Sequence, residues 1–334
     1  MQGLEHNMVS VVSTFSGVGG SSLGYKLAGC KVLASLEFIE EARVCYRLNF
    51  PGTPIIEKDI RDVTGKEILD LIGLKKGELD ILDGSPPCAS FSMAGKRERT
   101  WGKVKSYSST EQRVDDLFDE QIRLISEIKP KAIVLENVKG MTLGVAKELL
   151  TNYLIKLQKI GYNLSVEVLN AQYYETATSR ERLIIIGIRK DLNKLPSHPQ
   201  PFCKPITFKE ATKNITVTEA EKDKLKVTSK RVLYYLNYTK QGEQCCKYNQ
   251  NNSYFSHRRA SMTKPCPTIT TSIDIYHPLE NRTLTIKELK AVSSFPDDFK
   301  ITGTYKQQYE RIGRAVPPNL MKHIALHLVK ILES

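Results

Sequence analysis

Residues 8–24 read Met8-Val9-Ser10-Val11-Val12-Ser13-Thr14-Phe15-Ser16-Gly17-Val18-Gly19-Gly20-Ser21-Ser22-Leu23-Gly24. The apolar first half predicts a short buried strand, Met8–Phe15, and the glycines after it predict a turn into a helix that ends near Ala28-Gly29. Because glycines let the backbone approach a ligand closely, this order of strand, turn and helix indicates a cradle for a nucleotide-like ligand. A plain turn is one alternative. A dinucleotide fingerprint is another, but it is incomplete because Ser22 stands where its third glycine belongs.

Two carboxylates follow at the ends of the next two predicted strands. The strand Lys31–Glu37 ends in Glu37, and the strand Pro54–Ile60 carries Asp59 at its tip. A carboxylate at such a strand end can bind both ribose hydroxyls of an adenosine. One acid alone means little, but two at successive strand ends after a glycine turn predict an adenosine ligand. No stretch resembles a phosphate-binding P-loop.

A cysteine follows the next apolar run. Residues 79–82 predict a buried strand that stops at Asp83-Gly84, and Ser85-Pro86-Pro87-Cys88 comes directly after it. The two prolines restrict the backbone and cannot extend the strand. In an open α/β sheet, ligands bind at the carboxyl ends of the strands. Cys88 is therefore either a small buried core residue or a nucleophile, and the prolines and the loop favour a presented thiol.

The segment after Cys88 is polar and basic. It is either an ordinary solvated loop or a lid that grips phosphates. Its candidates for phosphate contacts are Lys96, Arg97, Arg99, Lys103 and Lys105, and its other candidate contacts are Ser90 and Trp101.

Predicted strands and helices alternate up to about residue 190. Helices are expected at 39–49, 115–128 and 145–160, and strands at 131–135, 162–170 and 183–188; the first of these strands ends in Glu136-Asn137-Val138. This alternation predicts a doubly wound, mostly parallel α/β sheet. Residues 191–257 begin with four prolines and are then rich in Tyr, Asn, Gln and Lys. They predict a separate small module, either a surface insertion or a binding face.

The composition narrows the class of protein. The 334 residues include 49 Lys+Arg and 37 Asp+Glu, for a formal net charge of +12, which indicates a polyanionic partner, most simply nucleic acid. The seven cysteines show no disulfide framework, and residues 1–10 lack a signal-peptide pattern, so we expect a cytoplasmic protein without a membrane span. We expect no metal, because Cys245-Cys246 has no matching ligand pair, and His323 and His327 lack the glutamate of a zincin.

In this order the motifs resemble the C5-cytosine-specific DNA methyltransferase family of bacterial restriction–modification systems. The resemblance covers nearly the whole chain, and so many motifs in order are very specific. The residues that carry it are Phe15-Ser16-Gly17-Val18-Gly19-Gly20, Glu37, Asp59-Ile60, Ser85-Pro86-Pro87-Cys88, Asp116-Leu117-Phe118, Glu136-Asn137-Val138, Arg180-Glu181-Arg182, Arg282-Thr283-Leu284-Thr285, Ser294-Phe295-Pro296-Asp297 and Ile312-Gly313-Arg314-Ala315-Val316-Pro317-Pro318.

Four positions depart from the family pattern. Ser13 stands where an acid is common, Ala89 replaces a glutamine, Glu175-Thr176-Ala177-Thr178 replaces Gly-Val-Pro-Gln, and Arg314 replaces an asparagine. None of them alters the nucleophile or the glutamate. They bear on cofactor affinity and on details of the DNA-binding loop.

The resemblance implies a fold of the S-adenosylmethionine-dependent methyltransferase type in two domains. Residues 1–190 and 305–334 would form the catalytic and cofactor-binding domain, and residues 191–304 a smaller target-recognition domain, with DNA in the cleft between them. The implied catalytic residues are Cys88, Glu136, Arg180 and Arg182. The implied cofactor-binding residues are Phe15, Gly17, Gly19, Gly20, Glu37, Phe38, Asp59, Ile60, Pro87, Leu117 and Val316. The expected DNA-binding residues are Ser90, Lys96, Arg97, Arg99 and Lys103.

The implied reaction transfers a methyl group from S-adenosylmethionine to C5 of a flipped cytosine, leaving S-adenosylhomocysteine. Cys88 would attack C6, Glu136 would donate a proton to N3, and Arg182 would hold O2. The expected partner is double-stranded DNA. The protein is expected to be a monomer that associates with the nucleoid when it binds DNA. A cognate restriction endonuclease is expected to act separately. Three alternatives stay open: a tRNA cytosine-5 methyltransferase on the same scaffold, a catalytically silent DNA-binding relative, and a nicotinamide oxidoreductase.

Overall fold

The computed structural model describes residues 8–87, 105–107, 110–112, 116–248 and 256–334. Cys88 and the expected DNA contacts Ser90, Lys96, Arg97, Arg99 and Lys103 lie outside these residues, as does Trp101. Contacts divide the chain into two compact units. The first unit contains Met1–Leu169, Arg182–Gln200 and Met321–Ser334, and the second contains Asn170–Glu181 and Pro201–Leu320.

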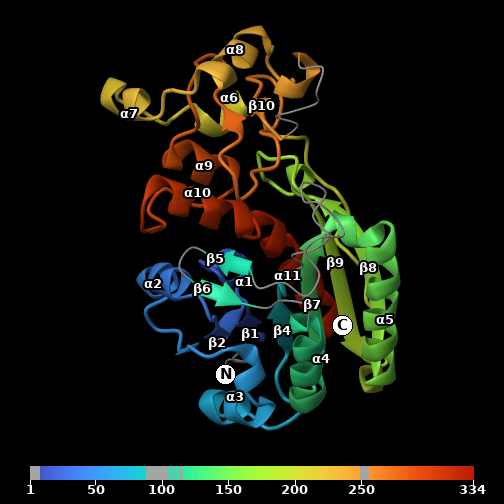
Figure 1. Cartoon of the computed structure of the whole chain (residues 1–334). Coiled ribbons are helices and arrows are strands. Elements are labelled where there is room, and N and C mark those ends of the chain that lie inside the picture. The colour runs from blue at the N-terminus through green and yellow to red at the C-terminus, as the bar shows by residue number, and fades with distance from the viewer. Residues whose placement is uncertain (1–7, 88–104, 108–109, 113–115, 249–255) are drawn as a thin grey trace, which may run out of the picture. The chain divides into compact units, whose positions relative to one another are not determined.

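The first unit is built on a seven-stranded sheet with the strand order β3-β2-β1-β4-β7-β9-β8 (Figure 1). β1 pairs in parallel with β2 and β4, as do β2 with β3 and β4 with β7, whereas β9 runs antiparallel to β7. The expected mostly parallel α/β sheet is therefore confirmed. Its strands are β1 (Ser10–Thr14), β2 (Lys31–Leu36), β3 (Ile55–Ile56), β4 (Ile81–Gly84), β7 (Ala132–Val138), β8 (Tyr162–Asn170) and β9 (Glu181–Arg189).

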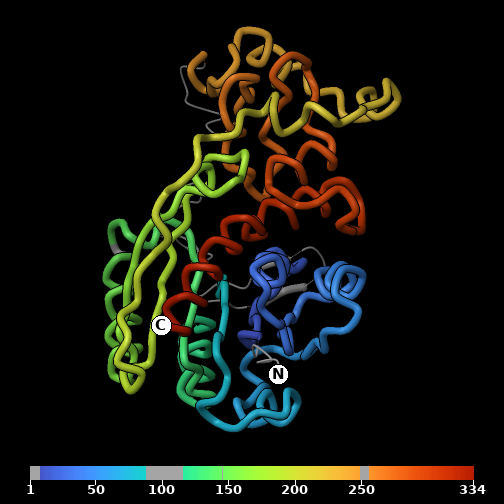
Figure 2. Tube along the Cα trace, turned by 180° about the vertical axis from the view of Figure 1, so that it is seen from behind, coloured from blue at the N-terminus to red at the C-terminus, as the bar shows by residue number. Residues whose placement is uncertain are grey.

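Helices cover both faces of this sheet. α4 lies in front of it in Figure 1, and α11 lies on the opposite face, as the view from behind in Figure 2 shows. The helices are α1 (Gly20–Leu27), α2 (Glu40–Asn49), α3 (Gly65–Ile72), α4 (Leu117–Ile128), α5 (Val145–Lys159) and α11 (Pro318–Glu333). A separate antiparallel pair joins β5 (Lys105–Tyr107) to β6 (Thr110–Gln112). No helix in the described ranges is long and apolar enough to cross a membrane.

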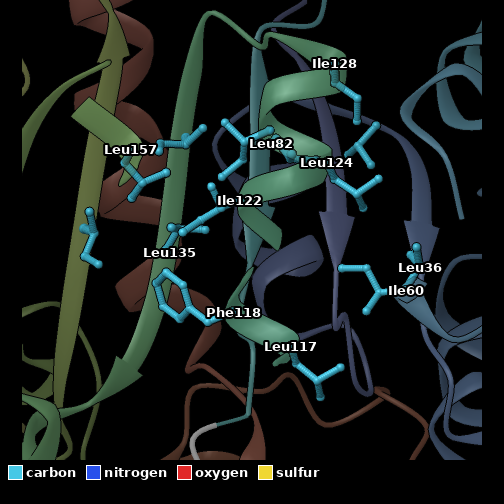
Figure 3. Packing of buried hydrophobic residues seen from close by; sticks show 14 of the residues in the cluster. Leu36, Ile60, Leu82, Leu117, Phe118, Ile122, Leu124, Ile128, Leu135 and Leu157 are labelled. Atoms are coloured by element: carbon cyan, nitrogen blue, oxygen red, sulfur yellow. The ribbon is translucent and has the colours of Figure 1, made fainter. Parts of the chain in front are cut away.

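The main core lies between α4 and the sheet (Figure 3). Ile122 and Leu124 of α4 are buried in one cluster with Leu82 of β4 and Leu135 of β7. Burying such a side chain fully contributes about 1.5–3 kcal/mol relative to leaving it exposed. The cluster therefore holds the central strands β4 and β7 in place, and with them the loops that follow.

The third strand is much shorter than the sequence predicts. We expected Pro54–Ile60, but β3 contains only Ile55–Ile56. Asp59 is the cause, because its side chain accepts a hydrogen bond from the amide of Arg61 and begins a 3₁₀ turn, Ile60–Asp62. A side chain that bonds the backbone two residues ahead favours a turn over a strand.

The second unit carries short helices joined by long irregular segments. It contains α6 (Phe208–Thr212), α7 (Glu219–Lys224), α8 (Lys230–Tyr238), α9 (Ile286–Val292), α10 (Tyr305–Arg314) and the short parallel pair β10 (Arg258–Arg259) and β11 (Ile275–Tyr276). Capping boxes begin α6, α7, α9 and α10, each with a threonine followed three residues later by Glu or Gln. In each box two amides at the helix start find partners, which stabilises these short helices.

The contact division differs from the expected domain boundaries at three places. Residues 170–181 and 305–320 fall in the second unit, whereas the sequence assigned them to the catalytic domain. Residues 191–200 fall in the first unit, whereas the sequence assigned them to the target-recognition domain. The amide of Cys266 donates to Ala177 O at 2.8 Å, and Tyr309 and Ile312 are buried in the core of the second unit. The functional roles of the two domains remain predictions.

Candidate active site

The glycine turn between β1 and α1 needs left-handed backbone. Phe15, Gly17 and Gly19 have φ values of 51°, 55° and 96°. A Cβ at Gly19 would lie only 2.3 Å from the Phe50 ring, so no other residue fits there without displacing it. Gly20 begins α1, so the turn lies at the amino end of that helix. The amino end of a helix is a place where ligands with negative or polar groups bind.

Glu37 joins this turn to the end of β2. Its Oε2 accepts from the Gly17 amide at 2.7 Å, and its Oε1 accepts from the Ile39 amide at 2.7 Å. Burial raises the pKa of Glu37, and the two amides oppose that shift. Because the two carboxylate oxygens together have four lone pairs, the group can also accept from a ligand. The site thus fits a ligand with two neighbouring hydroxyls, such as a ribose.

The other expected cofactor residues are placed differently from one another. Phe38 and Pro87 are half-buried, whereas Ile60 and Leu117 are buried in the main core and Val316 is buried in the second unit. Asp59 is bound by its neighbour, since its Oδ2 accepts from Arg61 Nη1 at 2.9 Å. Any contact of Asp59 with a ligand must therefore share the carboxylate with Arg61.

The residues just before Cys88 are tied to β7. Pro86 O accepts a hydrogen bond from Asn137 Nδ2 at 3.1 Å, and Asn137 Oδ1 accepts from the Val138 amide at 2.8 Å. Gly84 has no room for a side chain, because a Cβ there would lie 2.6 Å from Thr14 Oγ1. The sequence placed Asn137 in a motif without assigning it a contact. The bond to Pro86 positions the start of the Cys88 loop.

Glu136 and Arg182 form a buried ion pair. β7 and β9 run antiparallel, with Glu136 opposite Ile184 and Val138 opposite Arg182, so the two side chains are diagonal neighbours. Arg182 Nε lies 2.8 Å from Glu136 Oε1. Burial lowers the pKa of Arg182, and the charge of Glu136 opposes that shift. The sequence expected Glu136 just beyond a strand, but it lies within β7, which continues to Val138.

Arg180 contacts backbone carbonyl groups, whereas Arg182 pairs with Glu136. It is buried in the second unit, where its Nη1 donates to Ile269 O at 3.1 Å and to Gly313 O at 2.8 Å. At Gly313 a Cβ would meet Thr270 O at 1.9 Å, so two backbone segments approach closely there. The contacts of Arg180 hold these segments together.

Sequence reasoning missed one acid in this region, Asp83. It is buried in β4 beside Ser13 of β1, and Ser13 Oγ donates to its Oδ2 at 2.8 Å. The only sequence signal was the position of Asp83 at the end of an apolar run, which predicted a strand end and no function.

Comparisons with known proteins agree with one another. The family model for C-5 cytosine-specific DNA methylases matches residues 9–330. The type II methyltransferase M.Sau96I of Staphylococcus aureus is 33% identical over 97% of this chain and 76% of its own length. M.PspPI of a Psychrobacter species is 31% identical over 97% and 80%.

Solved structures share the fold. A protein encoded within an Escherichia coli prophage, described as a DNA modification methyltransferase, aligns with a TM-score of 0.76 at 21% identity over 98% of this chain and all of its own. A variant of DNMT2 from Spodoptera frugiperda aligns with a TM-score of 0.70 at 18% identity over 97% and 99%.

Proposed function

Because this chain belongs to the C-5 cytosine-specific DNA methylase family, we propose that it methylates cytosine at C5 in a specific duplex DNA sequence through a covalent bond between Cys88 and C6. Its relatives are type II methyltransferases, which places its activity in restriction–modification. The structural observation that supports the mechanism most directly is the bond from Asn137 to Pro86. It links the strand of Glu136 to the loop that begins at Cys88.

The chemistry must overcome the weak nucleophilicity of cytosine C5. Attack by the Cys88 thiolate on C6 forms a carbon–sulfur bond and makes C5 enamine-like. S-adenosylmethionine supplies, when bound, an electrophilic methyl group and leaves as S-adenosylhomocysteine. Loss of the C5 proton then restores the ring and expels the Cys88 thiolate. The base must first leave the helix, at a cost of a few kcal/mol.

We assign the contacts to the flipped base to Glu136 and Arg182. A protonated Glu136 donates to N3 as negative charge builds there, and Arg182 donates to O2. Arg182 Nε lies 2.8 Å from Glu136 Oε1, and this proximity supports the assignment of both side chains to the same base. Arg180 is buried among the carbonyls of Ile269 and Gly313, so we assign it a positioning role.

The direct test of this function is methylation mapping of plasmid DNA from cells that express the chain. We expect 5-methylcytosine at one recognition sequence. A parallel assay with labelled S-adenosylmethionine should give incorporation into duplex DNA and none into tRNA. Incorporation into tRNA alone would favour the tRNA-modifying alternative.

We expect Glu37→Ala to weaken binding of S-adenosylmethionine about ten- to hundredfold. The reason is the loss of a hydrogen bond to a charged group, worth about 1.5–3 kcal/mol. Calorimetry measures the affinity, and the KM for DNA should stay unchanged. Glu40→Ala removes an exposed acid three residues away and serves as the control. Unchanged affinity in Glu37→Ala would mean that Glu37 only holds the glycine turn.

We further expect the basic residues of the loop after Cys88 to bind phosphates without reading sequence. Replacing Lys96 and Arg97 with glutamine should weaken binding to all DNA alike and lower the log–log salt slope by about two. The control pair is Lys75 and Lys76, two exposed lysines that precede the amino end of β4. A changed recognition sequence in the Lys96/Arg97 variant would place target reading in this loop instead of in residues 191–304.

A further inference from the structure

Asp83 is a buried carboxyl group that the proposed mechanism does not use. Its side chain lies in β4 at 1% exposure and is surrounded by hydroxyl groups. Ser13 Oγ donates to Oδ2 at 2.8 Å, and Tyr25 OH donates to Oδ1 at 3.3 Å. Among the described residues, no lysine or arginine forms an ion pair with it. A buried carboxylate normally has such a partner, because an isolated charge is costly to bury.

The charges around Asp83 do not replace that partner. β1 contributes Ser13 and α1 contributes Tyr25 and Ser21, which are neutral donors, while Glu136 of β7 adds negative charge. Tyr46 of α2 also senses the charge of Asp83. Burial raises the pKa of Asp83 to about 7, Glu136 adds to the shift, and the hydroxyl donors oppose it. Near neutral pH this carboxyl is thus balanced between its two forms.

The strand register places Ser13 and Asp83 side by side. β1 and β4 pair in parallel, with Ser13 directly opposite Asp83, and the 2.8 Å hydrogen bond joins the two side chains. A carboxyl group at either position can therefore reach the same point of the sheet.

The order of the strands indicates which part of the cofactor lies near Asp83. Glu37 follows β2, and β1 separates β2 from β4. Cys88 follows β4 by four residues. A cofactor whose ribose is held by Glu37 must extend across β1 towards β4, because its methyl group has to reach a cytosine bonded to Cys88. Its sulfur then lies at the carboxyl ends of β1 and β4, near Asp83.

We propose that ionised Asp83 is a positioning residue that supplies the buried negative charge for the sulfonium of S-adenosylmethionine, and so favours this substrate over the uncharged thioether of S-adenosylhomocysteine. The inference rests on the proposed function. In a site of low dielectric, a fixed carboxylate attracts a permanent cation more strongly than it does in water. The product lacks that cation, so the same carboxylate does not retain it.

A consequence is coupling between cofactor binding and proton release. If the sulfonium requires the ionised form, a group with a pKa near 7 is about one-tenth ionised at pH 6 and about nine-tenths ionised at pH 8. The affinity for S-adenosylmethionine, relative to that for S-adenosylhomocysteine, should therefore rise about tenfold over this range. The positive sulfonium also lowers the pKa of the α-amino group in S-adenosylmethionine, so the wild-type ratio is compared at each pH with the ratio for Asp83→Asn.

Calorimetry on the full chain with both ligands at pH 6, 7 and 8 tests the proposal. For wild type we expect the tenfold rise in the affinity ratio, and proton release at pH 6 that depends on the ionisation enthalpy of the buffer. Asp83→Asn should give a ratio that lacks this rise, with S-adenosylmethionine bound about a hundredfold more weakly at pH 8 and S-adenosylhomocysteine nearly unchanged.

Two further variants serve as matched controls. Asp80→Asn removes an acid that lies just before β4 and is already paired with Lys131, and should leave the pH profile as in wild type. Exchanging the two residues, Ser13→Asp with Asp83→Ser, moves the carboxyl across the observed hydrogen bond and should restore the pH-dependent preference. Circular dichroism and thermal unfolding check the fold of each variant.

The experiment distinguishes the role of Asp83 from the proposed methyltransferase function. Equal loss of both ligands in Asp83→Asn, or an unchanged pH profile, would overturn the role of Asp83 while leaving the proposed function intact. Failure of wild type to bind S-adenosylmethionine would overturn both.

Discussion

Cys88→Ala is expected to abolish methyl transfer to DNA while leaving the affinity for S-adenosylmethionine close to that of wild type. Without a thiolate at C6, cytosine C5 never becomes enamine-like, and alanine offers no other nucleophile. A thiol with an ordinary pKa near 8.5 needs only modest activation to attack. Transfer of labelled methyl groups measures the first effect, and calorimetry measures the second.

A trapped intermediate gives the same test a positive readout. Wild type should form a covalent adduct with duplex DNA that carries 5-fluorocytosine, because fluorine cannot leave as a proton does. Cys246→Ala, which removes a half-buried cysteine of the second unit, should still form the adduct. An adduct that survives Cys88→Ala would show that another residue is the nucleophile.

Glu136→Gln is expected to lower the rate of methyl transfer by about a hundredfold or more, as for loss of a general acid. Glutamine keeps the shape of the side chain but cannot give a proton to cytosine N3. Affinity for duplex DNA should barely change, because phosphate contacts dominate it. Single-turnover kinetics measure the rate, and a filter-binding or anisotropy assay measures the affinity.

The ion pair requires a stability control for this variant. Arg182 is buried and loses its carboxylate partner in Glu136→Gln, and breaking a buried pair costs about 3–5 kcal/mol when a charge is left alone. Thermal unfolding should therefore be recorded, and rates compared well below the transition. Glu148→Gln, at an exposed site on α5, should leave both rate and stability unchanged. Near-wild-type turnover in Glu136→Gln would mean that another group stabilises the charge at N3.

Local sequence patterns determined the fold class and the glycine turn. Apolar runs ending in turn residues predicted β1, β2, β4 and β9 to within about two residues at either end. Such runs are short-range signals, since burial, backbone entropy and turn chemistry act over a few neighbouring residues. Gly17 and Gly19 were predicted in a turn for the same reason, and their positive φ values are what that turn requires.

Only the tertiary structure decided how distant side chains meet. The antiparallel register of β7 and β9 pairs Glu136 with Arg182, 46 residues later, and no local pattern encodes such a register. The tertiary structure also shows that Arg180 donates to backbone carbonyl groups, that Asp59 accepts from Arg61, and that Ser13 lies opposite Asp83. The partners of Glu136, Arg180 and Ser13 lie far away along the chain. The direction of a side chain there depends on the packing of the whole sheet, which the spacing of residues along the chain does not specify.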